Sequence, residues 1–256
     1  IGALSFKDVI RVARHRAPVV LSEESLAEIA KSSERIRQLA HQTIPVYGVS
    51  TGFGALASKH IPAEMRTALQ RGLIRSHAAG SGKEVETEVV RALMLLRLST
   101  LATGRTGVRP EVAQAYADML SANLTPVVYE YGSLGCSGDL APLAHCALAI
   151  IGEGQVRDEQ GQLLDTADAL QQHGLTPVVL AEKEGLALIN GTDGMLGMLV
   201  MAITDLGRLT RLADVAAAMS LEGLVGTDRV FAADLHSLRP HPGQQAAAAN
   251  MLKVLE

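Results

Sequence analysis

The stretch Glu84–Thr103, EVETEVVRALMLLRLSTLAT, decides the fold. It is nearly all apolar, and a helix that is apolar around its whole circumference belongs in a protein core. Gly104 and Gly107 follow it and are suited to stop a helix, and Pro110 is suited to start the next one. The sequence therefore predicts a buried helix in a core built from packed helices.

Helix-start signals also occur on the N-terminal side of this stretch. Ser5-Phe-Lys-Asp8 resembles a capping box, Ser22 is placed to cap a second helix, and Pro62 opens a third. Apolar residues recur at helical spacing within the second and third helices. We expect the inner face of the second helix to carry Leu26, Ile29, Ile36 and Leu39, and one stripe of the third helix to carry Met65, Leu69 and Leu73.

The C-terminal side combines helices with a few short extended segments. Leu140–Ile151 is an apolar helical segment, and the pattern from Thr192 to about Leu224 would span roughly 50 Å as one helix. A last helix begins near Pro242. Extended structure is expected at Thr125–Tyr131 and in a small hairpin formed by Gln155-Val-Arg and Gln162-Leu-Leu.

The predicted fold class is mainly α. We expect an N-terminal, mostly helical globular domain with a few short strands over residues 1–188, followed by the start of a long-helix bundle over residues 189–256. The 256-residue chain starts at Ile1 without Met and ends at Glu256 inside an apparent helix. We therefore expect both ends to be those of a fragment or a processed product.

Composition argues against several classes of protein. The net charge is −4 and no basic stripe is present, so no nucleic-acid partner is expected. The most apolar run, Met195–Thr204, is too short to cross a membrane. Cys136 and Cys146 do not make a disulfide framework, which favours the reducing cytoplasm, and the histidines show no metal-ligand spacing, so we expect no metal.

The tripeptide Cys136-Ser137-Gly138 is suited to cyclise on itself. Gly138 has no side chain, so a tight turn could press its backbone nitrogen against the Cys136 carbonyl carbon. Attack and loss of water would give a five-membered imidazolone ring, and loss of water from Ser137 would leave an exocyclic methylidene. The product is an electrophile, and Asp139 could manage the protons.

Other interpretations of these glycine-rich segments are available. Ser137 or Asp139 could simply cap the helix that follows. A serine-hydrolase elbow fits poorly, because Gly138 follows Ser137 directly. Gly52-Phe-Gly54-Ala-Leu-Ala57 matches a dinucleotide fingerprint only weakly, because Pro62 interrupts the helix that should follow, so we expect no nucleotide cofactor.

Four ordered segments resemble the aromatic amino acid ammonia-lyase and aminomutase family, and the likeness covers essentially the whole chain. The prosthetic-group segment of that family is similar to GSLGCSGDLAPL at Gly132–Leu143. The other three segments are YGVSTGFG at Tyr47–Gly54, RSHAAG at Arg75–Gly80 and EGLALINGT at Glu184–Thr192. The resemblance implies that Cys136-Ser137-Gly138 becomes 4-methylidene-imidazol-5-one (MIO).

The resemblance also implies roles for four further residues. Tyr47 would be the base that removes the β-proton of the substrate, on a flexible lid, and Asn190 would contact the amino group or the prosthetic ring. Ser76 and His77 would face the substrate side chain, where a buried imidazole needs hydrogen-bond partners. From the residues alone, Tyr47 could be a packed loop tyrosine, His77 a hydrogen-bonded structural histidine, and Asn190 a turn residue that caps the next helix.

The implied activity is the conversion of L-histidine to urocanate and ammonia. Members of the family that prefer phenylalanine or tyrosine resemble Phe-Leu or His-Leu where this chain has Ser76-His77. Family members also form tetramers and continue beyond the segments matched here, with further site residues. A phenylalanine or tyrosine lyase, an aminomutase, and a catalytically incomplete fragment therefore remain as alternatives.

Overall fold

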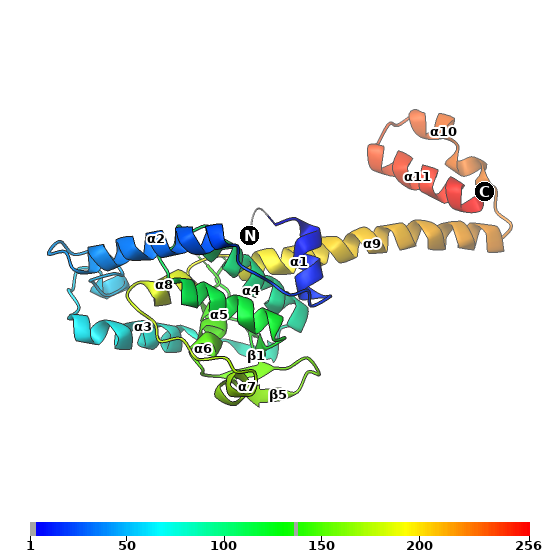
Figure 1. Ribbon diagram of the computed structural model, residues 1–256. Helices are drawn as coiled ribbons and strands as arrows, with labels where there is room; N and C mark the ends of the chain where they lie inside the picture. The colour runs from blue at the N-terminus through cyan, green and yellow to red at the C-terminus, as the bar shows by residue number, and fades with distance from the viewer. Residues whose placement is uncertain (1–3, 136–137) are drawn as a thin grey trace. The chain divides into compact units, whose positions relative to one another are not determined.

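The predicted core helix is helix α4, Thr87–Ala102, in the computed structural model, which describes residues 4–135 and 138–256. Eleven of its side chains are buried, including both of its arginines, Arg91 and Arg97. It packs against α1, Phe6–Ala13, and α5, Pro110–Ser121, and also contacts α2, Glu23–Ala40 (Figure 1). The prediction of a buried helix is therefore confirmed.

The capping signals in the sequence also predict helix starts correctly. Ser5 and Asp8 form a reciprocal capping box at α1, and the Ser22 side chain accepts a hydrogen bond from the Ser25 N–H at the start of α2. Pro62 precedes the first residue of α3, Ala63–His77. Local backbone chemistry fixes these starts, so no tertiary information is needed to place them.

Helices α3, α6 and α8 pack against one another and form the second group of helices. Helix α6 spans Leu140–Ile150 and α8 spans Glu184–Ile189. The short helix α7, Thr166–Gln172, lies beside the small sheet. Since α3 ends at His77, α6 begins after Asp139 and α8 ends before Asn190, this group carries most of the predicted site residues at its helix ends.

Two small antiparallel sheets complete this part of the chain. Strands β2, Thr125–Pro126, β4, Gln155–Arg157, and β5, Leu163–Asp165, form one sheet, and its β4–β5 pair is the predicted hairpin. The other sheet pairs β1, Ser81–Glu84, with β3, Tyr129–Tyr131. Strand β1 has no counterpart in the sequence prediction, because its four residues are all exposed and carry no apolar alternation.

The chain divides into two compact units, Ile1–Val200 and Met201–Glu256. Helix α9, Asp193–Gly223, begins in the first unit and continues into the second, close to the predicted bounds. The second unit also contains η2, Asp228–Phe231, α10, Ala233–Ser237, and α11, Pro242–Leu255, which pack together. Among the described residues, one helical stretch within Glu184–Gly223 is long and apolar enough to cross a membrane. Core helices of soluble proteins meet the same criteria of length and composition.

Candidate active site

Two backbone segments that are distant in sequence meet where α6 begins. The Asp139 backbone N–H donates to the Gly191 carbonyl oxygen at 2.6 Å. A Cβ atom on Gly138 would lie 2.4 Å from that oxygen, and the Gly138 φ of +147° is one that side chains disfavour. Only glycine fits at position 138. Cys136 and Ser137, which are predicted to react with Gly138, lie outside the described residues.

The Asp139 carboxylate is fully buried and is held on both oxygens. Its Oδ1 accepts from the Ser133 hydroxyl at 2.5 Å, and its Oδ2 accepts from the Met195 N–H in the first turn of α9 at 2.9 Å. Asp139 occupies the N-cap position of α6, but its side chain makes no capping bond to that helix. Its carboxylate is instead fixed beside Gly138 at the positive end of α9.

Asn190 follows α8 and belongs to the same junction. Its backbone N–H donates to the Leu186 carbonyl at 3.1 Å, while its side chain is exposed. Arg97 of α4 hydrogen-bonds to the turn that Asn190 forms with Gly191. Arg97 donates through Nη1 to the Ala187 carbonyl at 3.1 Å and through Nη2 to the Asn190 carbonyl at 3.3 Å.

The acidic partner of Arg97 is Asp193, the first residue of α9, and the two side chains form a buried ion pair. Burial raises the pKa of the Asp193 carboxyl, and the charge of Arg97 opposes that rise.

The charges of Arg97 and Asp193 also act on two fully buried side chains, Tyr116 and Cys146. Burial raises the pKa of both side chains. The Tyr116 hydroxyl has no hydrogen-bond partner among the described residues.

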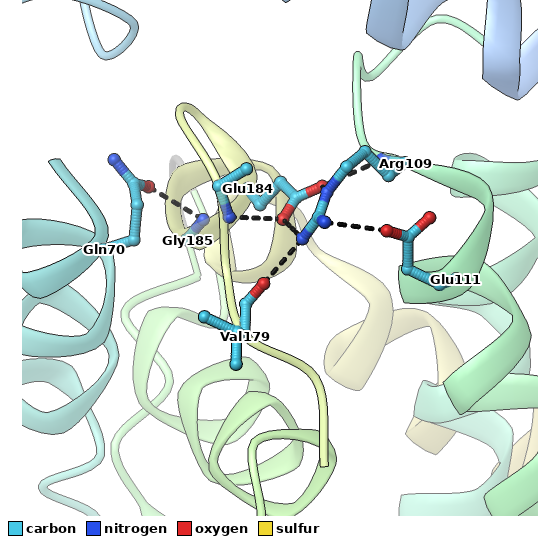
Figure 2. A network of polar contacts seen from close by, with 7 residues as sticks. Gln70, Arg109, Glu111, Val179, Glu184 and Gly185 are labelled. Atoms are coloured by element: carbon cyan, nitrogen blue, oxygen red, sulfur yellow. Dashed lines mark hydrogen bonds and ion pairs between the residues drawn. The ribbon is translucent and has the colours of Figure 1, made fainter. Parts of the chain in front are cut away.

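Figure 2 shows how α8 is fixed at its first residue, Glu184. This buried carboxylate accepts from the backbone N–H and from Nε of Arg109, both at 2.9 Å, and from the Ala181 N–H at 2.6 Å. The next residue, Gly185, donates its N–H to the side-chain oxygen of Gln70 on α3 at 2.9 Å. Helix α8 is thus attached to the start of α5 and to α3.

Ser76 and His77 lie at one end of a cleft along α3 with a volume of about 520 Å³. The Ser76 hydroxyl donates to the Leu73 carbonyl at 2.9 Å, and its oxygen lies 3.0 Å from Nδ1 of His77. The predicted stripe of Met65, Leu69 and Leu73 lines this cleft. The side chain of Met65 is 57% exposed and forms part of the cleft wall.

Tyr47 lies beside the same cleft. Its exposed ring packs edge-on against Phe53, a cleft residue, with the ring centres 6.2 Å apart. Gly48 has a φ of +71°, and a Cβ atom there would lie 3.0 Å from Leu186 of α8. The loop that carries Tyr47 is therefore packed against the helix that ends at Asn190.

His145 of α6 is a site neighbour that the sequence did not indicate. Its Nε2 accepts the Gly80 N–H at 3.1 Å, and its ring packs edge-on against Tyr129 with the ring centres 5.3 Å apart. Burial lowers the pKa of His145. This contact anchors the backbone that follows Ser76 and His77.

The structure thus gathers the predicted residues into two groups. Tyr47, Ser76 and His77 lie along the cleft, and Gly138, Asp139 and Asn190 lie at the junction. Sequence reasoning missed Arg97, Arg109 and Asp193, although a charged residue inside the apolar run of α4 is a usable signal for Arg97. Among residues 4–135 and 138–256, no group of three or more His, Cys, Asp or Glu side chains could hold a metal ion.

Comparison with protein families and curated sequences gives one consistent assignment. The aromatic amino acid lyase family model matches residues 4–256. The chain is 61% identical to histidine ammonia-lyase of Streptomyces avermitilis, over 99% of this chain and 50% of that protein. It is 44% identical to tyrosine ammonia-lyase of Cupriavidus metallidurans, over 96% of this chain and 46% of that protein. The chain spans about half the length of the curated relatives it matches.

The solved structures with the same fold belong to enzymes with different activities. Tyrosine aminomutase from Streptomyces globisporus matches with a TM-score of 0.88 at 40% identity, covering 97% of this chain and 47% of that one. Histidine ammonia-lyase from Trypanosoma cruzi matches with a TM-score of 0.88 at 35% identity, covering 97% of this chain and 48% of that one. The predicted, mainly helical fold class is confirmed.

Proposed function

The chain belongs to the aromatic amino acid lyase family, and on that premise we propose that its protein is an ammonia-lyase that converts L-histidine to urocanate and ammonia. The observation that carries the choice of substrate is the polar pair Ser76–His77 at the end of the cleft. A cleft end that carries hydrogen-bonding groups favours a substrate with polar ring atoms over one with a hydrocarbon ring. The 61% identity to a histidine ammonia-lyase supports the same choice.

We propose that Cys136-Ser137-Gly138 forms the MIO prosthetic group of this protein. The described residues fit such a group, because Gly138 is in a cradle that excludes a Cβ atom and Asp139 is held next to it by Ser133 and Met195. Once formed, the group supplies an electrophile that makes the substrate amine a better leaving group. To the neighbouring Asp139 carboxylate we assign the transfer of protons during ring formation.

The remaining residues would bind and orient the substrate. Ser76 and His77 would hold the imidazole of the substrate, and the exposed Asn190 amide would contact its amino group. Tyr47 would remove the β-proton, and its place beside the cleft, against Phe53, supports that role. Fixing these groups on helix ends and a packed loop lowers the entropic cost of reaching the reactive geometry.

An assay of product formation with several amino acids tests the proposal. The protein is incubated with L-histidine, L-tyrosine and L-phenylalanine, and products are followed by absorbance and by mass spectrometry. Urocanate from L-histidine alone supports the proposal. Release of ammonia from tyrosine or phenylalanine only would overturn the substrate, and a β-amino acid of unchanged mass would show an aminomutase, an activity found among the solved relatives.

The intact mass separates an enzyme from a catalytically incomplete chain. Formation of the ring removes two molecules of water, one with the Cys136 carbonyl oxygen and one with the Ser137 hydroxyl. An unmodified mass, together with no turnover of any of the three substrates, would support a chain that only folds and associates. We further propose that the protein acts in the cytoplasm as a homo-oligomer, a tetramer in its full-length form.

A further inference from the structure

We propose that the buried Arg97–Asp193 pair is a positioning device that holds the Asn190–Gly191 turn against Gly138 and so promotes ring closure of the tripeptide. The inference rests on the proposed function, because it concerns formation of the MIO group. We assign Arg97 and Asp193 no contact with the substrate or with the reacting atoms. They act through the turn.

The first step of the argument is the contact between Arg97 and the turn. The Arg97 guanidinium donates to the carbonyls of Ala187 and Asn190 and pairs with Asp193, so one side chain joins the end of α8 to the start of α9. A Cβ atom on Gly191 would overlap the guanidinium, at 1.6 Å from Nη2. The guanidinium therefore lies directly under the Gly191 backbone.

The second step is the contact between the turn and the tripeptide. On its other side, Gly191 accepts the Asp139 N–H at 2.6 Å and lies against Gly138, where a Cβ atom would meet the Gly191 oxygen at 2.4 Å and its nitrogen at 2.9 Å. Helix α9, which begins at Asp193, donates the Met195 N–H to the Asp139 carboxylate at 2.9 Å. Gly138 and Asp139 thus contact the Asn190–Gly191 turn and the first turn of α9, and the Arg97–Asp193 pair connects these two segments.

The third step is energetic. A buried ion pair rarely stabilises a fold more than apolar side chains of the same size, because removing two charges from water is costly. This pair is also incompletely bonded, since Arg97 Nε has no hydrogen-bond partner among the described residues. Stability alone therefore explains the pair poorly, whereas fixing the Ala187 and Asn190 carbonyls next to Gly191, which contacts Gly138, gives the pair a role.

The reaction that the pair would promote balances without an oxidant. The Gly138 nitrogen bonds to the Cys136 carbonyl carbon, and the carbonyl oxygen leaves as water with the hydrogens of the Gly138 and Ser137 amides. A second water then leaves with the Ser137 hydroxyl and its α-hydrogen. Since misplacing reacting atoms by about 1 Å costs on the order of a hundredfold in rate, a loosened turn should slow the first step strongly.

The chain offers a matched control on the same helix. Arg91 of α4 is buried like Arg97, donates to the backbone carbonyls of Val12 and Leu120, and also leaves one nitrogen, Nη1, unbonded among the described residues. It contacts neither the turn nor the tripeptide in any described interaction. Loss of Arg91 should therefore disturb the core to a similar extent without moving Gly191.

The test compares ring closure in the parent chain, Arg97→Met/Asp193→Asn and Arg91→Met. The double variant removes both charges and leaves no lone buried ion. Each protein is made by cell-free synthesis, the folded fraction is isolated by size exclusion, and loss of two waters is followed by intact mass over time. We expect the parent and Arg91→Met to close at similar rates and the double variant to close about a hundredfold more slowly.

Three other outcomes would contradict the proposed role of the Arg97–Asp193 pair. Closure of the double variant at the parental rate would overturn it, and so would equal slowing in Arg91→Met, which would show a general effect of core damage. Should the double variant not fold, Arg97→Lys keeps the charge but lacks the fork that reaches both carbonyls, and parental closure there is again contrary. A parent chain that loses no water would overturn the proposed prosthetic group itself, a failure visible before any variant is compared.

Discussion

The candidate site is shaped by glycines in close backbone contact and by polar side chains with fixed hydrogen-bond partners. Gly138 and Gly191 pack backbone against backbone, which no larger residue permits at position 138. Chemical reasoning on the sequence identifies Gly138, because the need for a bare nitrogen is visible in the tripeptide. It does not identify Arg97, whose proposed role rests on the hydrogen bonds that this α4 residue donates to the Ala187 and Asn190 carbonyls.

Substitution of Gly138 by alanine should damage the junction. The added methyl group would meet the Gly191 backbone, so we expect the free energy of unfolding to fall by about 1–3 kcal/mol, as in other overpacked sites. Urea denaturation followed by circular dichroism measures this. Gly207→Ala is the control, because that glycine is exposed in α9 with open space around it, and alanine there should stabilise by up to about 1 kcal/mol. Equal stability of parent and Gly138→Ala would contradict the contact.

Tyr47→Phe should lower turnover without unfolding the protein. The exposed ring would keep its packing on Phe53, while the proposed base would be lost, so kcat should drop about 10²- to 10⁴-fold. Steady-state kinetics with L-histidine measure this. Tyr131→Phe, which removes the hydroxyl of another exposed tyrosine with no assigned role, should leave kcat unchanged. A Tyr47→Phe protein with full turnover would exclude Tyr47 as the base.

His145 should make stability depend on pH. Burial lowers its pKa below the ordinary 6.5, so between these two values the unfolded chain binds more protons than the folded one. The stabilisation is complete above pH 6.5 and is lost as the pH falls toward the folded-state pKa. In His145→Gln, whose side-chain oxygen can still accept the Gly80 N–H, this loss should be absent. Unfolding free energies measured across this range in both proteins decide it, and identical pH profiles would refute the assignment.

At the scale of elements, the sequence predicts what local chemistry fixes and misses what tertiary contact fixes. The starts of α1, α2, α3 and α5 follow from Ser5, Ser22, Pro62 and Pro110. Strand β1 is paired with β3 only through the fold, and its exposed residues give no pattern. The stripe Met65, Leu69 and Leu73 shows the same limit, because helical periodicity predicts an apolar face but not whether that face is covered.

Helix α8 depends on its anchor at Glu184. Arg109→Met would leave this buried carboxylate with backbone donors only, so we expect the free energy of unfolding to fall by about 1.5–3 kcal/mol, the range for hydrogen bonds to a charged group, because Arg109 itself is partly exposed. Glu111→Gln removes the exposed partner of the same arginine and should change stability by less than about 0.5 kcal/mol. Thermal and urea unfolding compare the two. Similar effects of both substitutions would argue against a special role for the Glu184 contact.

At the scale of the whole molecule, the second unit has an apolar surface on α9. Leu206, Leu209 and Leu212 recur every third residue and are 58%, 61% and 63% exposed. Contiguous exposed leucines are typical of surfaces that another protein surface covers. The start of a helix bundle and the homo-oligomer therefore remain predictions, which the exposure of these three side chains supports.

Association through this surface can be tested directly. Leu209→Glu/Leu212→Glu places two charges on it and should convert an oligomer to smaller species at equal protein concentration. Sedimentation velocity measures the change. Arg208→Glu, a charge change on the same helix, is the control and should leave association intact. A monomeric parent chain, or an oligomer indifferent to the double substitution, would contradict the prediction.

Under the proposed mechanism of ring closure, the contact between Gly138 and Gly191 also sets an order of events during synthesis. A nascent chain that ends before Gly191 has no surface against which Gly138 can be pressed, and Arg97 has no acidic partner until Asp193 has been added. Closure driven by this contact therefore waits until α8 and the first turn of α9 have left the ribosome. The loss of two waters from the mass of the finished chain would then show that these distant segments had been in contact, even after the chain is unfolded.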